Sequence, residues 1–541
     1  MNSFAQFFNG EFIYLKAFLR NVEHYPASPA LFCTTRNQGF SYLELNQAAN
    51  KLARALLSDG LTRGEAVMAS LYNTAEFVFA WIGTQKAGAV FSPINFRLAE
   101  GEIALHLDDS QPKVYLYDAE LKPVIEKAIQ IARHKPKTVV MVGPGEPLPG
   151  SISYADYVKN QSEQDPKFPA LGPMDEILRL YTSGTTGLPK GVPLNSLNNL
   201  MRSYDVIIHF PLSHLDKTMN MTPWFHAGGI HSGGPCPTLH IGGEIIALKA
   251  FDPERVLDDV EKYRITFLIG VPATLEMLSL TQEKKPRNLS SLKGIITMGA
   301  PLAREACLRY QQTLTRRIFN GYGTTETFWN TFLRPEDLPD QAGSAGRPCT
   351  DDEVRVVKLL ADKLAEPEQT VARDGNAEGE VIIRTLKSPL CYYQKPEEDA
   401  RHYYQGWYYS GDIAVWDEQG FITICGRKDD MLISGGENIH PVQVEEVINQ
   451  HPKVFDSLVT GTPDPKWGQM VTAYVVRKDQ SLTARELAEF CRKHPGLADF
   501  KRPRYLKFVD QLPMTATGKK MHHLLKRQAK TDLEKGELEK V

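Results

Sequence analysis

The segment YTSGTTGLPKG, residues 181–191, follows an apolar-leaning run and gathers glycines, serine and threonine hydroxyls and one lysine, Lys190. It contains no acidic residue. Glycine allows backbone N–H groups to approach an oxyanion closely, and the hydroxyls add further donors. A lysine at the end of the segment supplies a mobile positive charge. Together these residue types predict a loop that binds phosphate groups.

Two common nucleotide-binding patterns do not describe the chain. The Walker A pattern requires G-x-x-x-x-G-K-[ST], whereas Gly184 and Gly187 lie three positions apart and Lys190 follows three positions later. The segment GYGTTE at 321–326 departs from the G-x-G-x-x-G pattern at its last position, which is Glu326. Read alone, the glycine-rich segment also fits a flexible surface loop.

The composition is that of an ordinary globular protein, with 541 residues, 42% of them hydrophobic and 23% charged. The length predicts about three or four folding units. The 62 basic and 65 acidic residues leave a net charge of −3, which argues against a general nucleic-acid binder. The seven cysteines form no C-x-x-C pair, as in reducing compartments. Neither a membrane span nor a cleaved signal is visible, so we expect a cytoplasmic protein.

Alternating helical and strand patterns predict an α/β fold with parallel sheets flanked by helices. The strand segments include EAVMASLY, AVFSPIN, KVYLYD, TVVMVG, RITFLIGV and KGIITMGA, each separated from the next by a helical pattern or a turn. Short strands broken by glycine predict a β-rich subdomain at about 340–428. We expect a large N-terminal domain over 1–428 and a small mobile α+β C-terminal domain over 429–541. The charged residues 526–541 are expected to fray.

Five motifs occur in a fixed order along the chain: YTSGTTGLPKGV, GYGTTET, YYSGD, GRKDDMLISGGENIHP and PMTATGKK. Together they resemble the adenylate-forming superfamily, which includes acyl-CoA synthetases, peptide-synthetase adenylation domains and luciferases. The resemblance spans nearly the whole chain, and GGENIHP and IFNGYGTTET are most similar to the 4-chlorobenzoate-type aryl-CoA ligases. It implies two steps. A carboxylate attacks the α-phosphorus of ATP to give an acyl-adenylate and pyrophosphate, and a thiol then takes the acyl group and releases AMP.

The resemblance implies roles for the charged residues of the motifs. Glu326 is expected to bind Mg²⁺, with Thr325 at the α-phosphate, because magnesium favours one carboxylate plus substrate oxygens. Lys519 is expected to bridge the substrate carboxylate and the α-phosphate, and the family spacing favours it over the neighbouring Lys520. Asp412 is expected to accept hydrogen bonds from the ribose hydroxyls. The complete nucleotide set is Thr182, Ser183, Gly184, Thr185, Thr186, Lys190, Gly321, Tyr322, Gly323, Thr324, Asp412 and Arg427.

The same resemblance implies a rotation of the C-terminal domain about Asp429 between the two steps. Lys519 serves adenylation, and the face carrying Ser434 then serves thioester formation. The residues expected to bind coenzyme A are Arg97, Ser434, Gly435, Gly436, Trp467, Phe500, Arg502 and Arg504. An ordinary basic face with a core tryptophan is the alternative interpretation. The chain contains no carrier segment with a modifiable serine, which favours free coenzyme A over a carrier-bound thiol.

The acyl pocket implied by the resemblance is lined by Ala227, Gly228, Met298, Gly299, Ala300, Phe328 and Trp329, with His226 near the carboxylate. Ala227, Gly228 and Gly321 are small where the chlorobenzoate-type enzymes carry bulkier side chains, so we expect one wall to be widened. No dedicated cation is present to pair a second carboxylate. We therefore expect a monocarboxylate: an alicyclic, aryl or medium-chain acid.

Two other functions stay open at this point. One is a stand-alone adenylation enzyme that loads the phosphopantetheine of a carrier protein, and the other is a luciferase-like or catalytically silent relative. Lys519, Glu326 and Asp412 argue against a silent protein. One departure from the family pattern is Ser196, where many relatives carry histidine shortly after the phosphate loop. The oligomeric state is open, with a homodimer as one option.

Overall fold

A computed structural model describes residues 3–167, 171–183, 189–360, 363–434, 437–495, 497–514 and 520–541. The chain forms two units. The first comprises Met1–Ala342, Gly346–Glu353 and Ile383–Tyr408, and the second comprises Gly343–Ala345, Val354–Ile382 and Tyr409–Val541. The expected domain boundary at 428/429 falls inside the second unit and stays a prediction.

The first unit contains a seven-stranded sheet in the order β7-β6-β5-β3-β4-β8-β9. Its strands are parallel except for β9, which pairs with β8 in an antiparallel hairpin. The strands are β3 (Ala66–Ser70), β4 (Val90–Pro93), β5 (Val114–Asp118), β6 (Thr138–Val142), β7 (Ile152–Ser153), β8 (Glu176–Ser183) and β9 (Pro189–Asn195). The buried apolar runs predicted as strands are confirmed here, because parallel strands covered on both faces need no polar alternation.

A nine-stranded sheet completes the first unit, in the order β16-β15-β14-β13-β12-β10-β11-β1-β2. Its central strands, from β14 to β1, run parallel. The strands are β1 (Pro29–Cys33), β2 (Gln38–Ser41), β10 (Lys217–Asn220), β11 (Glu244–Ala247), β12 (Phe267–Gly270), β13 (Gly294–Met298), β14 (Ile318–Thr324), β15 (Phe328–Leu333) and β16 (Arg347–Pro348). The α/β class predicted from the sequence is confirmed.

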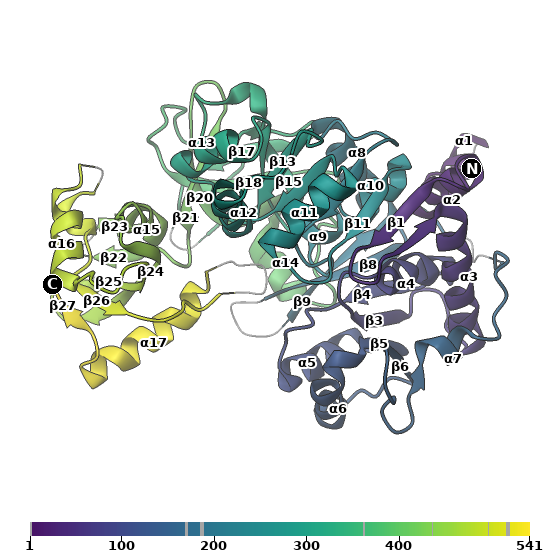
Figure 1. The fold of residues 1–541 in the computed structure, drawn as a ribbon. Helices are drawn as coiled ribbons and strands as arrows, with labels where there is room; N and C mark the ends of the chain where they lie inside the picture. The colour runs from purple at the N-terminus through teal and green to yellow at the C-terminus, as the bar shows by residue number, and fades with distance from the viewer. Residues whose placement is uncertain are drawn as a thin grey trace. The chain divides into compact units, whose positions relative to one another are not determined.

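Helices cover the faces of these sheets, as the labelled ribbon shows (Figure 1). Ser41 begins α3 with a capping box, in which its hydroxyl accepts from the Glu44 N–H and the Glu44 carboxylate accepts from the Ser41 N–H. The helices are α1 (Ser3–Glu11), α2 (Tyr14–His24), α3 (Tyr42–Ser58), α4 (Ala75–Lys86), α5 (Glu100–Ser110), α6 (Lys122–Ile131), α7 (Tyr154–Val158), α8 (Ser196–His209), α9 (Ala227–Ile230), α10 (Pro235–Ile241), α11 (Pro253–Tyr263), α12 (Pro272–Lys284), α13 (Arg304–Thr313) and α14 (Pro396–His402).

The second unit holds most of a five-stranded sheet, in which β20 pairs antiparallel with β21. Its strands are β17 (Glu353–Val357), β18 (Gly379–Arg384), β19 (Tyr403–Tyr404), β20 (Trp407–Trp416) and β21 (Ile422–Arg427). A six-stranded sheet follows, with β24 beside β25. Its strands are β22 (Leu432–Ser434), β23 (Glu437–Ile439), β24 (Val454–Asp464), β25 (Gly468–Arg477), β26 (Tyr505–Phe508) and β27 (Glu539–Lys540). The helices are α15 (Pro441–Asn449), α16 (Ala484–Lys493) and α17 (His522–Lys535).

The end of the chain corrects one expectation from the sequence. Residues 526–541 were expected to fray, but α17 runs to Lys535 and β27 pairs with β26. Leu525 and Ala529 bury one face of α17, and the buried Asp532 accepts a hydrogen bond from the Tyr474 hydroxyl at 2.6 Å. These contacts hold a helix whose sequence is rich in charged and polar residues.

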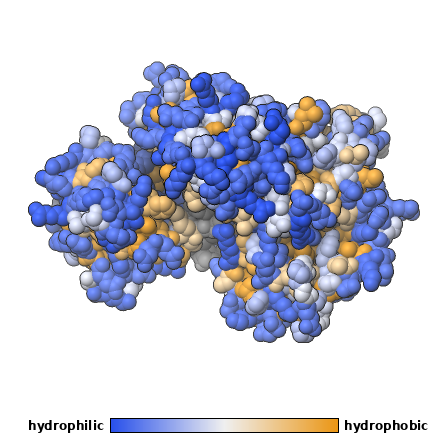
Figure 2. All heavy atoms as spheres, viewed as in Figure 1, coloured by the Kyte–Doolittle hydropathy of each residue, from blue (hydrophilic) through white to orange (hydrophobic). Residues whose placement is uncertain are grey.

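The visible surface is largely hydrophilic. On the face shown in Figure 2, polar residues cover most of the area, and apolar residues gather in small groups. Among the described residues, no helix has the length and apolar character that crossing a bilayer requires.

Candidate active site

The β8–β9 hairpin carries the glycine- and hydroxyl-rich segment. Thr182 pairs with Lys190 at its foot. Gly184, Thr185 and Thr186 lie outside the described residues, as does the Ser183 side chain. The Lys190 ammonium lies 3.1 Å from the Glu398 carboxylate and 5.1 Å from the centre of the Tyr392 ring. The one cation of the predicted phosphate loop therefore has a defined position.

Glu326 occupies the turn between β14 and β15. Its side chain is buried and accepts a hydrogen bond from the Tyr392 hydroxyl at 2.7 Å. Burial raises the pKa of Tyr392, and the charge of Glu326 adds to that effect. Thr324 and Thr327 join hydroxyls across the turn at 3.0 Å. Because Tyr392 contacts both Glu326 and Lys190, the structure brings these two predicted site residues to one tyrosine.

Arg202, on α8, fixes the backbone of this turn. The fully buried guanidinium donates to the carbonyl oxygens of Thr325 at 3.0 Å and of Glu326 at 3.3 Å. It also donates to the Lys387 carbonyl from two nitrogens, at 2.9 and 3.1 Å. Burial lowers the pKa of Arg202 to about 9, which still leaves it cationic at neutral pH. No motif marked Arg202 in the sequence.

The same helix, α8, accounts for the departure at Ser196. The buried Ser196 hydroxyl accepts a hydrogen bond from the Tyr14 backbone N–H at 2.6 Å. Serine therefore serves here to attach α2 to the first turn of α8.

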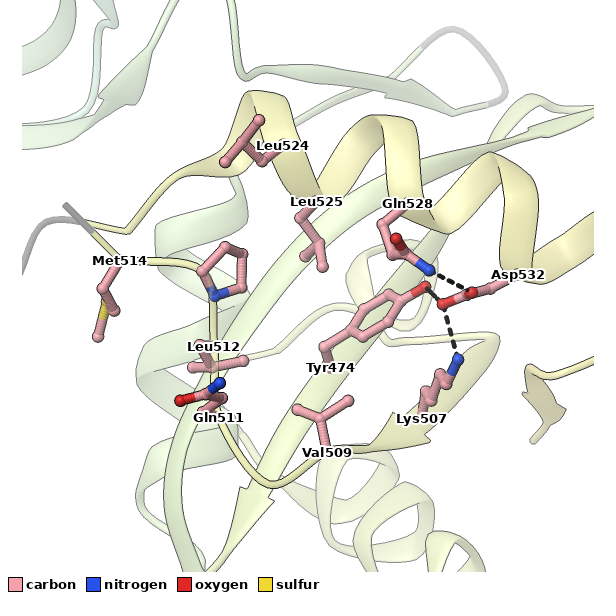
Figure 3. A pocket seen from close by; sticks show the side chains of 11 residues that line it. Tyr474, Lys507, Val509, Gln511, Leu512, Met514, Leu524, Leu525, Gln528 and Asp532 are labelled. Carbon is pink, nitrogen blue, oxygen red and sulfur yellow. Dashed lines mark hydrogen bonds and ion pairs between the residues drawn. The ribbon is translucent and has the colours of Figure 1, made fainter. Parts of the chain in front are cut away.

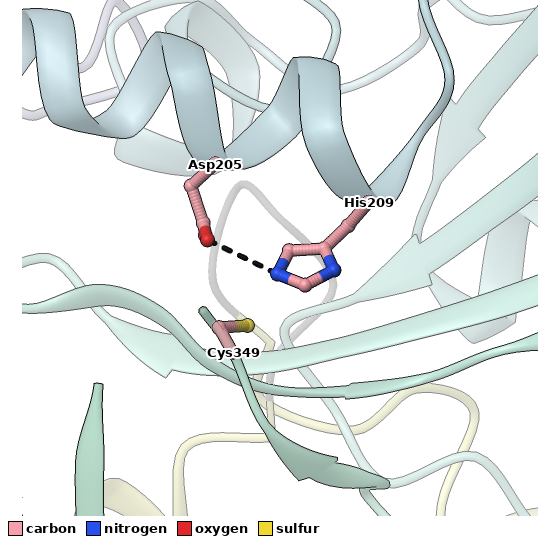
Figure 4. Close-up of side chains that lie close together, drawn as sticks. All are labelled: Asp205, His209 and Cys349. Carbon is pink, nitrogen blue, oxygen red and sulfur yellow. Dashed lines mark ion pairs between the residues drawn. The ribbon is translucent and has the colours of Figure 1, made fainter. Parts of the chain in front are cut away.

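Asp205, His209 and Cys349 form a buried cluster (Figure 4). Their side chains are of the types that bind metal ions in proteins. The cluster already has a cation, because the Lys387 ammonium lies 2.9 Å from Asp205 and 2.7 Å from Asp352. The ring nitrogens of His209 also have partners: Nδ1 lies 2.9 Å from the Arg334 guanidinium, and Nε2 lies 3.2 Å from both the Thr350 backbone N–H and the Asp205 carboxylate. We therefore interpret it as a structural charge network and not as a metal site.

A row of aromatic side chains joins two of the predicted residues. Rings of Tyr72 and Phe96 lie 4.5 Å apart, those of Phe96 and Phe225 5.2 Å, and those of Phe225 and His226 4.3 Å. The Arg97 guanidinium lies 5.6 Å from the Phe96 ring. Two predicted residues therefore contact the same row of rings. Arg97, expected at coenzyme A, lies beside Phe96, and His226, expected at the carboxylate, lies beside Phe225.

Two of the glycines expected beside the acyl group, Gly228 and Gly321, are already covered by large side chains. A Cβ on Gly228 would lie 2.9 Å from the Met298 thioether, and one on Gly321 would lie 2.7 Å from Nε1 of Trp329. The rings of Phe328 and Trp329 are stacked, with centroids 5.0 Å apart. We expected Gly228 and Gly321 to widen the acyl pocket. That effect is offset, because the Met298 and Trp329 side chains occupy the space beside the two glycines.

The remaining acyl-pocket residues lie at the ends of secondary elements. Ala227 is buried at the start of α9, directly after His226. Gly299 and Ala300 follow the last residue of β13, and Gly299 has a φ of 81°, a left-handed conformation that favours glycine. Tyr322 and Gly323 lie within β14, half-buried, one and two residues after Gly321. All of these belong to the first unit.

In the second unit, Asp412 and Arg427 face each other across β20 and β21. Nη1 of Arg427 donates to the Asp412 carboxylate at 3.0 Å, and Nη2 donates to the Ser410 carbonyl at 3.2 Å. Asp429 is exposed in the turn that follows β21. Arg427, one member of the pair predicted at the ribose, thus lies close in sequence to the predicted hinge.

Ser434 and Trp467 are neighbours within the second unit. Ser434 is paired with Gly468 between β22 and β25, and the Trp467 ring is 43% exposed. The tryptophan is therefore not a core residue. Gly435 and Gly436 lie outside the described residues.

A second group of predicted coenzyme A residues surrounds Asp499. Arg502 pairs with this carboxylate at 2.8 Å and Arg504 at 3.0 Å, while the Phe500 ring is 41% exposed. An exposed ring beside two arginines suits an adenine with a nearby phosphate. Phosphate would compete with Asp499 for both guanidinium groups.

Lys519 lies outside the described residues, but its neighbour Lys520 does not. The Lys520 ammonium pairs with Glu445 at 3.0 Å and with Asp456 at 2.9 Å. A bridge pairs Met514 with Lys520, the two described residues on either side of 515–519 in the sequence. Because Lys520 is held by two carboxylates, it is the poorer candidate for a substrate contact, which agrees with the family spacing.

A cavity of about 660 Å³ lies between α17 and the segment before Met514 in the second unit (Figure 3). Apolar residues line one side, and the Tyr474, Asp532 and Lys507 cluster lines the other, with Lys507 2.9 Å from Asp532. None of the predicted site residues lines it. This cavity is therefore not where the motifs place the chemistry.

Comparison with solved structures shows that the fold is a known one. The anthranilate CoA ligase AuaEII, solved in complex with anthranoyl-AMP, matches with a TM-score of 0.87 at 24% identity, over 99% of this chain and 100% of that one. The two chains share one fold over their whole lengths.

The chain belongs to the AMP-binding enzyme family, whose model matches residues 18–393, and the model of the AMP-binding enzyme C-terminal domain matches residues 443–519. Two relatives are the indoleacetate–CoA ligase of Aromatoleum aromaticum and the feruloyl-CoA synthase of Amycolatopsis sp. The first is 31% identical over 88% of this chain and 91% of its own. The second is 33% identical over 88% of this chain and 92% of its own.

Proposed function

We propose that the protein is an AMP-forming acyl-CoA ligase that activates a monocarboxylate with ATP and transfers the acyl group to coenzyme A. The observation that carries the proposal is the arrangement of Lys190 and Glu326 on either side of Tyr392, at the foot of the predicted phosphate loop. The family match and the acid–thiol ligase relatives support the same reaction.

The first step brings a carboxylate against the phosphates of ATP, so cations and oriented donors govern its rate. Lys190 would contact the β- and γ-phosphates, with backbone and hydroxyl donors from the loop. Thr325 would contact the α-phosphate, and Lys519 would bridge it to the attacking carboxylate. Asp412 would accept from the ribose hydroxyls, and Tyr322 would pack against adenine.

Glu326 fits a magnesium ligand, because it is a buried carboxylate positioned by a hydrogen bond from a neutral hydroxyl, and a hard cation prefers oxygen ligands of this kind. Mg²⁺ bound there would neutralise charge on the phosphates. Arg202 fixes the turn at two carbonyl oxygens, so the carboxylate is positioned in advance.

For the second step, we propose that the C-terminal domain, residues 429–541, turns about Asp429. Ser434, Trp467, Phe500, Arg502 and Arg504 would then meet coenzyme A, with Arg97 from the first unit. His226 would lie near the acyl carboxylate. The homodimer and the cytoplasmic location stay predictions from the sequence.

We infer that the acid is an aryl or medium-chain monocarboxylate, with an alicyclic acid as a further option. The stacked Phe328 and Trp329 favour a flat substrate, and the two relatives act on indoleacetate and ferulate by name. Met298 and Trp329 occupy the space beside Gly228 and Gly321. We therefore do not expect these two glycines to widen the acyl pocket much.

The test is a panel of carboxylates with ATP, Mg²⁺ and either coenzyme A or a phosphopantetheinylated carrier protein. We expect acid-dependent pyrophosphate release and mass-spectrometric detection of one acyl-CoA with AMP. Acyl transfer to the carrier but not to coenzyme A would establish the carrier-loading function instead. No pyrophosphate with any acid would refute both.

A further inference from the structure

The Lys190–Glu398 ion pair joins residues far apart in the sequence. Glu398 lies in the first turn of α14, and the two charged groups are 3.1 Å apart. Both side chains are mostly buried, with 13% of Lys190 and 17% of Glu398 exposed. Lys190 therefore has a partner before any ligand arrives.

Glu398 has further partners on its own helix. The Arg401 guanidinium donates to its carboxylate at 2.9 Å, and Nε2 of His402 lies 3.8 Å away. Burial opposes ionisation, yet Lys190, Arg401 and His402 together lower the pKa of Glu398. The carboxylate is therefore charged at neutral pH, and it keeps a cationic partner if Lys190 leaves it.

Lys190 likewise keeps a contact without Glu398. Its ammonium lies 5.1 Å from the Tyr392 ring centre, within the range of a cation–π interaction. Tyr392 in turn donates to Glu326. An exchange of the carboxylate for a phosphate would thus leave Lys190 beside Tyr392, and neither ion would become isolated.

We propose that Glu398 is an internal counter-ion that occupies Lys190 in place of the ATP phosphates and thereby weakens ATP binding. The inference rests on the proposed function, since it takes Lys190 as the phosphate contact. A phosphate and a carboxylate repel each other at one ammonium, so ATP must displace Glu398 from Lys190. The same carboxylate re-forms the pair when pyrophosphate leaves, which favours product release.

The test compares the wild type with Glu398→Gln and with Glu397→Gln, the exposed neighbour on α14. ATP–Mg²⁺ binding is measured by calorimetry without any acid, and kcat and KM for ATP by pyrophosphate release. We expect Glu398→Gln to lower both the Kd and the KM for ATP about two- to fivefold, with kcat within about twofold. Glu397→Gln should match the wild type.

Two further measurements separate this role from a structural one. AMP lacks the β- and γ-phosphates, so its Kd should not change in Glu398→Gln. In a Lys190→Ala background, Glu398→Gln should leave the Kd for ATP unchanged, because the coupling passes through the lysine. A Kd for ATP that rises or stays constant in Glu398→Gln overturns the inference, as does an equal change for AMP. Since binding is measured without acid, a missing pyrophosphate signal would count only against the proposed function.

Discussion

At the scale of single residues, the site depends on side chains that touch the predicted groups without belonging to any motif. Tyr392 holds Glu326, Arg202 holds the turn beneath it, and Glu398 holds Lys190. Each is a side chain with a specific partner far away in the sequence, so single substitutions can separate their contributions.

Tyr392→Phe removes the hydroxyl that donates to the Glu326 carboxylate and keeps the aromatic ring next to Lys190. A hydrogen bond to a charged group is worth more than a neutral one, so we expect the Mg²⁺ concentration for half-maximal activity to rise about three- to tenfold. Pyrophosphate release is measured against added Mg²⁺. Tyr393→Phe is the control, because the Tyr393 ring packs against a different residue. The Arg179 guanidinium lies 3.3 Å from the centre of that ring. An equal shift in both variants would contradict the role of Tyr392.

Lys387→Met leaves Asp205 and Asp352 buried without their shared cation. Removing one partner of a buried ion pair typically costs about 3–5 kcal/mol, so we expect a large fall in the free energy of unfolding. Denaturant titration measures it. Lys395→Met is the control: that lysine is 31% exposed and pairs with Asp109 at 3.1 Å, so its loss should cost about 1 kcal/mol or less. Similar losses in the two variants would contradict the structural role of the network.

At the scale of elements, the periodic patterns predicted the sheets because each buried strand is a short apolar run. β3, β4, β5 and β6 fall where such runs stand in the sequence. The ordered helix α17 was not predicted. Its burial depends on Leu525, Ala529 and the Tyr474–Asp532 hydrogen bond, and these few contacts do not stand out in a sequence rich in charged residues. Sequence reasoning also missed Arg202, Tyr392 and Glu398. Their partners in the β14–β15 turn and the β8–β9 hairpin are far away in the sequence, so only the tertiary packing brings them together.

The first residue of α17, His522, makes the second unit sensitive to pH. Nε2 of His522 lies 2.9 Å from Glu445 on α15. Burial opposes protonation, but Glu445 outweighs it and raises the pKa of His522 above 6.5. The pair therefore contributes fully to stability below pH 6.5, and the contribution is lost as the pH rises through the raised pKa.

We expect the unfolding midpoint of the second unit to fall as the pH increases from about 6.5. The fall should flatten in His522→Gln, which cannot gain the proton. Thermal unfolding followed across this range checks the expectation. His494→Gln is the control, since that half-buried histidine contacts the neutral Gln450. A midpoint that rises with pH, or a fall that persists in His522→Gln, would exclude the pair as its source.

At the scale of the whole molecule, the predicted nucleotide contacts are divided between the two units. Lys190 and Glu326 belong to the first, and Asp412 and Arg427 belong to the second, as does the segment around Lys519. Motif order predicts which residues take part in catalysis, and those roles stay predictions. It could not predict the packing between motifs, because spacing along a chain does not determine which side chains meet.

Lys519→Ala tests the division of labour between the two steps. We expect acid-dependent pyrophosphate release to fall about 10²-fold or more, since a cation at the developing charge is lost. Thioester formation from supplied acyl-adenylate should stay near the wild-type rate, because that step is assigned to another face. Separate assays of the half-reactions measure this. Lys520→Ala, in contrast, should lower stability through Glu445 and Asp456, and equal losses in both half-reactions for Lys519→Ala would contradict the assignment.

The contact between Gly321 and Trp329 has a consequence for how this protein can diverge. A methyl group on residue 321 would collide with the indole, whereas a smaller residue 329 would only leave room. Substitutions that change the acid preference must therefore occur in a fixed order. Trp329 must first be replaced by a smaller residue, and only then can Gly321 be replaced by a larger one. Descendants that carry a larger residue at 321 should be found only where 329 has already lost its ring.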